Sequence, residues 1–323
     1  MDRVRIAHTD LEVSRACMGA MTFGSQADLE ESKRIAARCF DAGINFFDTA
    51  NVYNQGESER IVGRVLGARR KDVILASKAR GAMGKPVEYA GLSRDAIRKA
   101  LEASLRRLNT DYLDVYYLHQ PDYGAPIEET LEVMDELRRE GKVRYPATSN
   151  YSAWQICEIH CICEKNGYAK PWLAQPMYNL TARGIEQEYL AYAKTAGISN
   201  VCYNPLAGGM LTGKQRKEAA PVPGTRFDGN EMYLKRYWHD PFFGAVDELR
   251  AIAAEAGLSL VQLAFAWILQ QEQAHCVILG ASRLEQLEEN LKAFDTPPLT
   301  ESQIEACDSV WQKLRGPAPV YNR

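Results

Sequence analysis

The stretch at residues 44–53, Ile-Asn-Phe-Phe-Asp-Thr-Ala-Asn-Val-Tyr, changes from apolar to polar within a few positions. Its beginning is a short apolar run that predicts a buried strand, and the polar residues start at Asp48. A carboxylate is therefore expected at the carboxyl end of this strand. The phenol of Tyr53 follows in the next loop.

Two further apolar runs end on a side chain that can do chemistry. Residues 73–77 lead into Lys78, and residues 113–118 lead into His119. The carboxyl ends of parallel strands meet at one edge of a sheet, so these two side chains should lie beside the carboxylate and the phenol. We expect an active site at this edge.

Apolar runs and helical patterns alternate along the chain after a β-hairpin expected at residues 4–14. The apolar runs lie near residues 16–19, 44–47, 73–77, 113–118, 143–149, 172–178, 199–203 and 276–279. The helical patterns lie near residues 28–42, 57–67, 93–108, 127–140, 152–165, 185–196 and 282–293. This alternation predicts a parallel α/β fold, a (β/α)8 TIM barrel, with residues 1–323 in a single domain. An open doubly wound sheet is the alternative, but no Gly-x-Gly-x-x-Gly follows the first strand.

Several segments go beyond the minimal barrel. Residues 208–246, rich in glycine, proline and aromatic side chains, predict a long functional loop over the rim. Residues 258–271 and 300–314 predict extra C-terminal helices, and residues 316–323 an extended arm. Pro146 falls within an expected central strand, where its missing N–H puts the local geometry in doubt.

Composition argues against some classes of partner. The chain is 46% hydrophobic and 25% charged, as is ordinary for a folded globular protein. A net charge of −3 gives no electrostatic reason to expect nucleic acid or an anionic membrane surface. The first residues lack the apolar segment of a signal peptide, and no apolar run is long enough to span a bilayer.

The cysteines are scattered without the spacing of a small disulfide scaffold, which predicts reduced thiols and a cytoplasmic location. The one cluster contains Cys157, His160, Cys161 and Cys163. A metal site is conceivable because Cys157 and Cys161 would share a helix face, but no fourth ligand with suitable spacing is evident. A helix with partly buried thiols is the simpler interpretation, and we expect no metal.

The four strand-end residues have compatible chemistry. A phenol with an ordinary pKa near 10 is a weak acid, and the Lys78 ammonium is expected to lower that pKa while Asp48 keeps the lysine charged. His119 can donate a hydrogen bond to a substrate oxygen. Such a site protonates a carbonyl oxygen as a hydride arrives from a cofactor. Singly, each residue has an ordinary structural explanation; together they favour catalysis.

At these positions the chain resembles the aldo-keto reductase family. The segments that carry the resemblance are Asp48-Thr49-Ala50-x-x-Tyr53, Ala76-Ser77-Lys78, Tyr117–Asp122, Met18–Gly24, Gln175–Asn179, Tyr203–Lys214 and Gly280–Leu291. The resemblance covers essentially the whole chain. It implies NADPH-dependent reduction of aldehydes or ketones to alcohols, with Tyr53 as the general acid and Asp48, Lys78 and His119 completing the catalytic set.

The resemblance also implies where the cofactor binds. The nicotinamide end would contact Gly19, Thr22, Asp48, Ser149, Asn150, Gln175 and Tyr203. The pyrophosphate and adenosine would contact Asn204, Leu206, Gly208, Lys214, Gly280, Ser282, Arg283, Gln286, Glu289 and Asn290. Glycines here are expected to let backbone N–H groups approach phosphate. Arg283, near a helix start, is expected to bind a 2′-phosphate, which favours NADPH over NADH.

Within the family, the chain is most similar to the branch of aflatoxin-aldehyde and succinic-semialdehyde reductases. That similarity implies a cofactor contact for Arg226. It implies a substrate pocket lined by Tyr53, His119, Tyr233, Arg236 and Arg323. Arginines there would suit an aldehyde with a distal carboxylate; the alternative is that these long side chains merely cover the rim.

Two other functions stay open from the sequence. The chain also resembles channel β-subunits, which keep the cofactor and act mainly through partners. It could instead be an alcohol or sugar dehydrogenase that runs toward oxidation. The expected partner is a small carbonyl substrate, with no nucleic acid and no membrane, and the protein is expected to be a monomer or a homo-oligomer such as a dimer.

Overall fold

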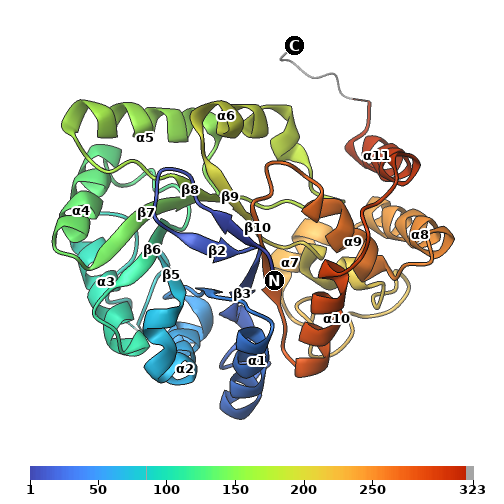
Figure 1. The fold of residues 1–323 in the computed structure, drawn as a ribbon, viewed down its shortest axis with the longest axis horizontal. Helices are drawn as coiled ribbons and strands as arrows, with labels where there is room; N and C mark the ends of the chain where they lie inside the picture. Colours follow the sequence, from blue (N-terminus) through green and yellow to red (C-terminus); the bar gives the residue numbers. More distant parts are fainter. Residues whose placement is uncertain (85, 318–323) are drawn as a thin grey trace.

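The computed structural model describes residues 1–84 and 86–317, and its centre is a closed barrel of parallel strands (Figure 1). The strands are β3 (Ala16–Gly19), β4 (Phe46–Asp48), β5 (Ile74–Ala79), β6 (Leu113–Leu118), β7 (Val143–Ser149), β8 (Leu173–Gln175), β9 (Ser199–Cys202) and β10 (Cys276–Gly280). Neighbours in sequence are neighbours in the barrel, and β10 pairs with β3 to close it. The predicted TIM barrel is confirmed.

The predicted N-terminal hairpin is also confirmed. β1 (Arg3–Arg5) pairs antiparallel with β2 (Glu12–Ser14). Ile6, Leu11 and Val13 are buried in the same apolar cluster as the inward-facing side chains of the barrel strands. The hairpin therefore covers the end of the barrel opposite the expected active site, because the strand carboxyl ends lie at the other end.

Helices surround the barrel, each following a strand. They are α1 (Leu29–Asp41), α2 (Glu57–Leu66), α3 (Arg94–Leu108), α4 (Ile127–Arg139), α5 (Ala153–Asn166), α6 (Tyr189–Ala196) and α10 (Leu284–Phe294). Local capping fixes several starts: the side chain of Ser93 accepts the Ala96 N–H at the start of α3, and Ser152 and Gln155 form a capping box at α5. Short capping sequences thus mark where several helices begin.

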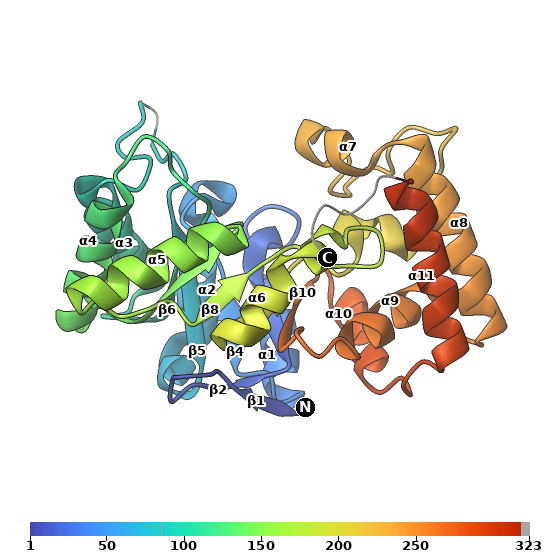
Figure 2. The ribbon, with the colours of Figure 1, turned by 90° about the horizontal axis from the view of Figure 1, so that it is seen from above.

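Four more helices lie outside this ring: α7 (Glu231–Tyr237), α8 (Asp240–Glu255), α9 (Leu260–Leu269) and α11 (Glu301–Arg315). Figure 2 shows α8, α9 and α11 on one side of the barrel, away from α3 and α4. The two extra C-terminal helices were predicted. The single long loop expected at 208–246 was wrong in part, because α7 and the first residues of α8 fall within it.

Two further expectations concern proline and the tail. Pro146 lies in β7 in regular register opposite Tyr116 of β6, so the strand runs through the proline. Gly316 ends α11, and the remainder of the expected arm, residues 318–323, lies outside the described residues. Within the described chain no single helix is long and apolar enough to cross a bilayer; α8 and α9 meet that test only as a pair bent by 88°.

Candidate active site

Three neighbouring strands bring the predicted residues together. Asp48 is the last residue of β4, Lys78 lies near the end of β5, and His119 directly follows β6. The parallel register places Asp48 beside Ala76 and Lys78 beside Tyr117. The expected arrangement at the carboxyl ends of these strands is therefore present.

Lys78 and Asp48 form a buried ion pair. The Lys78 ammonium is 0% exposed and donates to the Asp48 carboxylate, whose side chain is 3% exposed, and to the Thr49 carbonyl at 2.7 Å. The Gln175 amide donates to the second carboxylate oxygen at 2.9 Å. Burial lowers the pKa of Lys78, but the Asp48 carboxylate together with Tyr53 and Cys17 outweighs burial and the pKa is raised, so the lysine stays charged.

Tyr53 lies over this pair. The Lys78 Nζ is 5.0 Å from the centre of the Tyr53 ring, and the phenol lines the cavity described below. Burial raises the pKa of Tyr53 and Lys78 opposes that change, yet the net pKa lies above its ordinary value of 10.0. The expected net lowering was wrong, because desolvation outweighs the ammonium. The phenol is consequently protonated at neutral pH, which is the form a proton donor needs.

His119 packs edge-on against Tyr53, with ring centres 5.9 Å apart and an interplanar angle of 80°. Burial, followed by the positive charges of Lys78 and Arg80, lowers the pKa of His119 to about 3. The imidazole is therefore neutral at physiological pH. It can direct an N–H at an oxygen placed near the phenol without introducing a charge.

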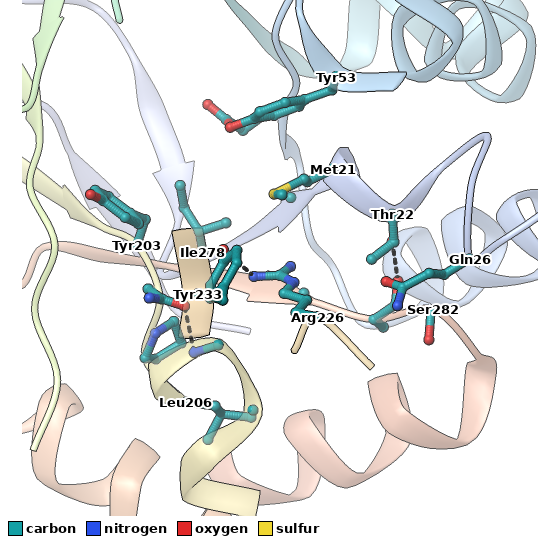
Figure 3. Close-up of a pocket in the computed structure, with 18 of the residues that line it drawn as sticks. Met21, Thr22, Gln26, Tyr53, Tyr203, Leu206, Arg226, Tyr233, Ile278 and Ser282 are labelled. Atoms are coloured by element: carbon teal, nitrogen blue, oxygen red, sulfur yellow. Dashed lines mark hydrogen bonds between the residues drawn. The ribbon is translucent and has the colours of Figure 1, made fainter. Parts of the chain in front are cut away.

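These groups border a cavity of about 600 Å³ at the carboxyl end of the barrel. The predicted cofactor residues that line it are Gly19, Thr22, Asp48, Ser149, Asn150, Gln175, Tyr203, Asn204, Leu206, Gly208, Lys214, Arg226, Gly280, Ser282, Gln286, Glu289 and Asn290. The predicted substrate residues that line it are Tyr53, His119, Tyr233 and Arg236. Figure 3 shows Tyr53 and Ser282 at well-separated places in this pocket.

Two predicted residues do not line the cavity, and a third lies outside the described residues. Lys78 is fully buried behind the lining residues Asp48 and Tyr53, with which it interacts. Arg283 is exposed and occupies the N-cap position of α10 without a side-chain capping hydrogen bond, beside the lining residue Ser282. Arg323 lies outside the described residues.

A chain of hydrogen bonds fixes one wall of the cavity beside His119. The Tyr203 hydroxyl donates to the Asn150 side chain at 2.7 Å, and the amide of Asn150 donates to the His119 carbonyl at 2.8 Å and to the Ser149 hydroxyl at 3.0 Å. Ser149 in turn donates to the Gln175 carbonyl at 3.0 Å. The wall is held in one shape by strands β7, β8 and β9 together.

Arg226 and Tyr233 form another wall. The Arg226 Nη1 donates to the Tyr233 hydroxyl at 3.3 Å, and Figure 3 shows this bond within the pocket. A Cβ at position 280 would lie 2.9 Å from the Arg226 Nη2, and a Cβ at position 208 would lie 2.6 Å from the Tyr233 ring. In this structure Gly280 and Gly208 make room for those side chains; the expected approach of backbone to phosphate remains a prediction.

The donor set of this region suits a ligand with phosphate groups. Lys214 and Arg226 bring positive charge to the lining, and α10 begins at Leu284, next to the lining residue Ser282. Ammonium and guanidinium groups near a helix N-terminus are typical of phosphate sites. The residues present fit a dinucleotide that extends from Tyr53 toward α10.

Sequence reasoning missed other lining residues, including Met21, Gln26, Arg80, Gln120, Thr212, Gln215, Gly224 and Met232. Most lie in loops whose path no local pattern predicts. The Gln26 amide donates to the Gly224 carbonyl at 2.6 Å and joins two loops across 198 residues of sequence. Arg80 could have been identified from the sequence, because it follows Lys78 by two residues and residues two apart in a strand point to the same face.

The cysteine-containing segment forms α5. Cys157 and Cys161 are exposed, Cys163 is buried, and the His160 ring nitrogen is 2.9 Å from the Pro171 carbonyl. Among the residues that the structure describes, no group of three or more His, Cys, Asp or Glu side chains could hold a metal ion.

A parallel barrel with a protonated tyrosine, a buried lysine–aspartate pair and a neutral histidine beside a cavity has the parts of an oxidoreductase acting on small carbonyl compounds. The chain belongs to the aldo/keto reductase family, whose model matches residues 15–312. Members of this family generally use nicotinamide cofactors.

The chain is similar both to aldehyde reductases and to potassium channel subunits. The chain is 37% identical to aflatoxin B1 aldehyde reductase member 2 of Rattus norvegicus, over 95% of this chain and 87% of the relative. It is 36% identical to aldo-keto reductase family 7 member A3 of Homo sapiens, over 95% and 96%. It is also 40% identical to a probable voltage-gated potassium channel subunit beta of Arabidopsis thaliana, over 93% of each chain.

Proposed function

We propose that this protein reduces aldehydes or ketones to alcohols with NADPH, and that Tyr53 donates the proton. The observation that carries the proposal is the Tyr53 phenol, raised in pKa by burial and placed over the buried Lys78 ammonium at the edge of the cavity. Family membership and the aldehyde reductase relatives support carbonyl reduction.

Different residues of the cavity would hold different parts of a dinucleotide. Lys214, Arg226 and Ser282 would hold its phosphates, while Asn150 and Gln175 would hold the nicotinamide amide beside Tyr53. When bound, the reduced nicotinamide supplies the hydride, which no side chain can supply. We infer NADPH rather than NADH from Arg283, whose exposed guanidinium next to Ser282 suits a 2′-phosphate.

The catalytic residues handle the proton and the carbonyl oxygen. Tyr53 donates its phenolic proton to that oxygen, and the Lys78 ammonium stabilises the tyrosinate left behind. Asp48 keeps Lys78 charged and in place through the buried ion pair. The neutral His119 ring donates a hydrogen bond that orients the carbonyl oxygen toward Tyr53.

The substrate end carries Tyr233 and Arg236, with the Arg236 guanidinium carbon 5.8 Å from the centre of the Tyr233 ring. A guanidinium at this position suits an aldehyde with a distal carboxylate, such as succinic semialdehyde. Arg323 remains a proposed third contact. A cytoplasmic location also remains part of the proposal, based on the free cysteines.

The test is NADPH consumption with succinic semialdehyde and with butanal, an uncharged aldehyde of the same chain length. We expect turnover with the unaltered protein and a loss of about 10²-fold or more in Tyr53→Phe, with NADPH affinity nearly unchanged. Loss of both turnover and NADPH binding in Tyr53→Phe would instead give the tyrosine a structural role.

A cofactor-binding regulatory subunit is the second candidate, favoured by the similarity to the potassium channel subunits. The rate of NADPH-dependent turnover distinguishes a regulatory subunit from a reductase. A regulatory subunit should bind NADPH tightly and reduce every member of a wide carbonyl panel very slowly. Rapid reduction that depends on Tyr53 would exclude this second function as the principal one.

A further inference from the structure

Arg80 occupies an unusual backbone conformation at the edge of the catalytic cavity. It directly follows β5, two residues after Lys78, and lines the cavity with Tyr53 and His119. Its φ of 110° lies in a region that side chains other than glycine rarely adopt. Such strain persists only where the surrounding structure holds it, and it is concentrated at functional sites.

Hydrogen bonds between two loops hold Arg80 in place. Its Nε donates to the Pro121 carbonyl at 3.0 Å, and its own carbonyl accepts the Gly91 N–H at 3.0 Å. The neighbouring Leu92 N–H donates to the Asp122 carboxylate at 2.7 Å. The loop after β5 is therefore joined to the loop after β6. Arg80 is fixed through Nε, and its two terminal nitrogens have no hydrogen-bond partner among the described residues.

No acidic side chain of residues 1–84 and 86–317 forms an ion pair with Arg80 within 4.0 Å. Asp122, the carboxylate in the joined loop, accepts the backbone N–H groups of Leu92 and Gly124. The described cavity lining includes two acidic residues, Asp48, which is paired with Lys78, and Glu289, which belongs to α10. Among the described residues, no carboxylate that lines the cavity therefore forms an ion pair with Arg80.

The charge of Arg80 acts close to the reacting groups. It contributes, after burial and Lys78, to lowering the pKa of His119. Arg236 lines the same cavity from α7, on a different element of the chain. Two guanidinium groups from separate elements thus border the space in which a carbonyl compound would have to lie beside Tyr53.

We propose that Arg80 binds an anionic group, a carboxylate, of the carbonyl substrate and so selects charged over uncharged substrates. This inference rests on the proposed function and adds a specificity-determining residue to it. The two terminal nitrogens of a guanidinium match the two oxygens of a carboxylate, and the Nε bond to Pro121 holds the fork before substrate arrives.

Arg80→Asn is the sharpest variant, because asparagine tolerates positive φ better than most residues and carries no charge. A lost charge-assisted hydrogen bond of about 1.5–3 kcal/mol corresponds to a fall of roughly 10- to 150-fold in kcat/KM for succinic semialdehyde. We expect the loss mainly in KM, and a change of no more than about twofold for butanal. Arg60→Asn, on the exposed surface of α2, is the matched control and should leave both values unchanged.

A second readout does not depend on turnover. Succinate carries a carboxylate at each end and has no aldehyde group to be reduced, so it reports on binding alone. Calorimetry in the presence of NADP should show weaker succinate binding to Arg80→Asn than to the unaltered protein. Equal losses for succinic semialdehyde and butanal would overturn the proposal and give Arg80 a structural role. Equal succinate affinity in both proteins would overturn it as well. If butanal and succinic semialdehyde both fail as substrates while succinate binding still depends on Arg80, the reductase function fails and the carboxylate site stands.

Discussion

The buried pair of Lys78 and Asp48 provides the most quantitative test of this site. Asp48→Asn removes one charge and leaves the Lys78 ammonium, 0% exposed, without its counter-ion. The Thr49 carbonyl then remains as its acceptor. Breaking a buried ion pair by removing one partner costs about 3–5 kcal/mol, because the remaining charge stays desolvated. We expect that loss in the free energy of unfolding, and a comparable loss in Lys78→Met.

The double variant should behave differently. Asp48→Asn with Lys78→Met removes both charges and keeps side chains of similar size. The Thr49 carbonyl and the new amide would each lose one hydrogen bond. Each loss lowers the free energy of unfolding by roughly 1 kcal/mol. We therefore expect the double variant to be about 2 kcal/mol less stable than the unaltered protein, and more stable than either single variant.

Urea unfolding followed by tryptophan fluorescence and circular dichroism measures all four proteins under one condition. The cycle isolates the coupling between the two side chains, since additive effects would give a double variant with the summed loss. A double variant that loses the full sum would refute the reasoning. It would show that Lys78 and Asp48 stabilise the barrel independently and not as a charge pair.

Three further results are expected. The pKa of His119 is about 3 in the folded protein and 6.5 when unperturbed, so the unfolded chain binds an extra proton between those two values. The free energy of unfolding should therefore fall as the pH is lowered below 6.5. His119→Phe should reduce this pH dependence, as measured by urea titrations at several pH values. An unchanged slope would contradict the assignment. Arg283→Ala should weaken NADPH roughly tenfold or more and NADH little, measured by fluorescence quenching; equal losses would exclude the 2′-phosphate contact. The reduction rate should stay level from about pH 6 to about pH 9, because the raised pKa of Tyr53 keeps its proton available, and a fall centred near neutrality would point to another proton donor.

Much of the arrangement of the candidate catalytic groups was predictable because it follows from strand geometry. Polar residues directly after apolar runs mark strand ends, and consecutive parallel strands are neighbours in a barrel. Asp48, Lys78 and His119 could therefore be placed together from their positions alone. The cofactor residues came instead from the family resemblance, and the cavity contains nearly all of them.

Other features depend on contacts between distant segments. Helix α7 appears where a loop was expected, because a short helix stabilised by packing leaves little periodic signal in the sequence. Arg80 gains its place from bonds to the loop after β6, and Gln26 meets Gly224 across most of the chain. No local pattern encodes these pairings.

The sequence by itself determined the barrel and the identity of the groups at the carboxyl ends of its strands, since hydrophobic periodicity and strand ends are local properties. The tertiary structure alone decided the direction of the Tyr53 pKa, because the balance between burial and the Lys78 charge depends on how closely the chain packs around the phenol. It also decided that Lys78 is buried away from the cavity while Arg80 lines it, although the two residues are only two positions apart in sequence. Residues two apart in a regular strand share a face, so the difference arises after β5 ends at Ala79, where Arg80 takes a φ of 110° and bonds to the loop after β6.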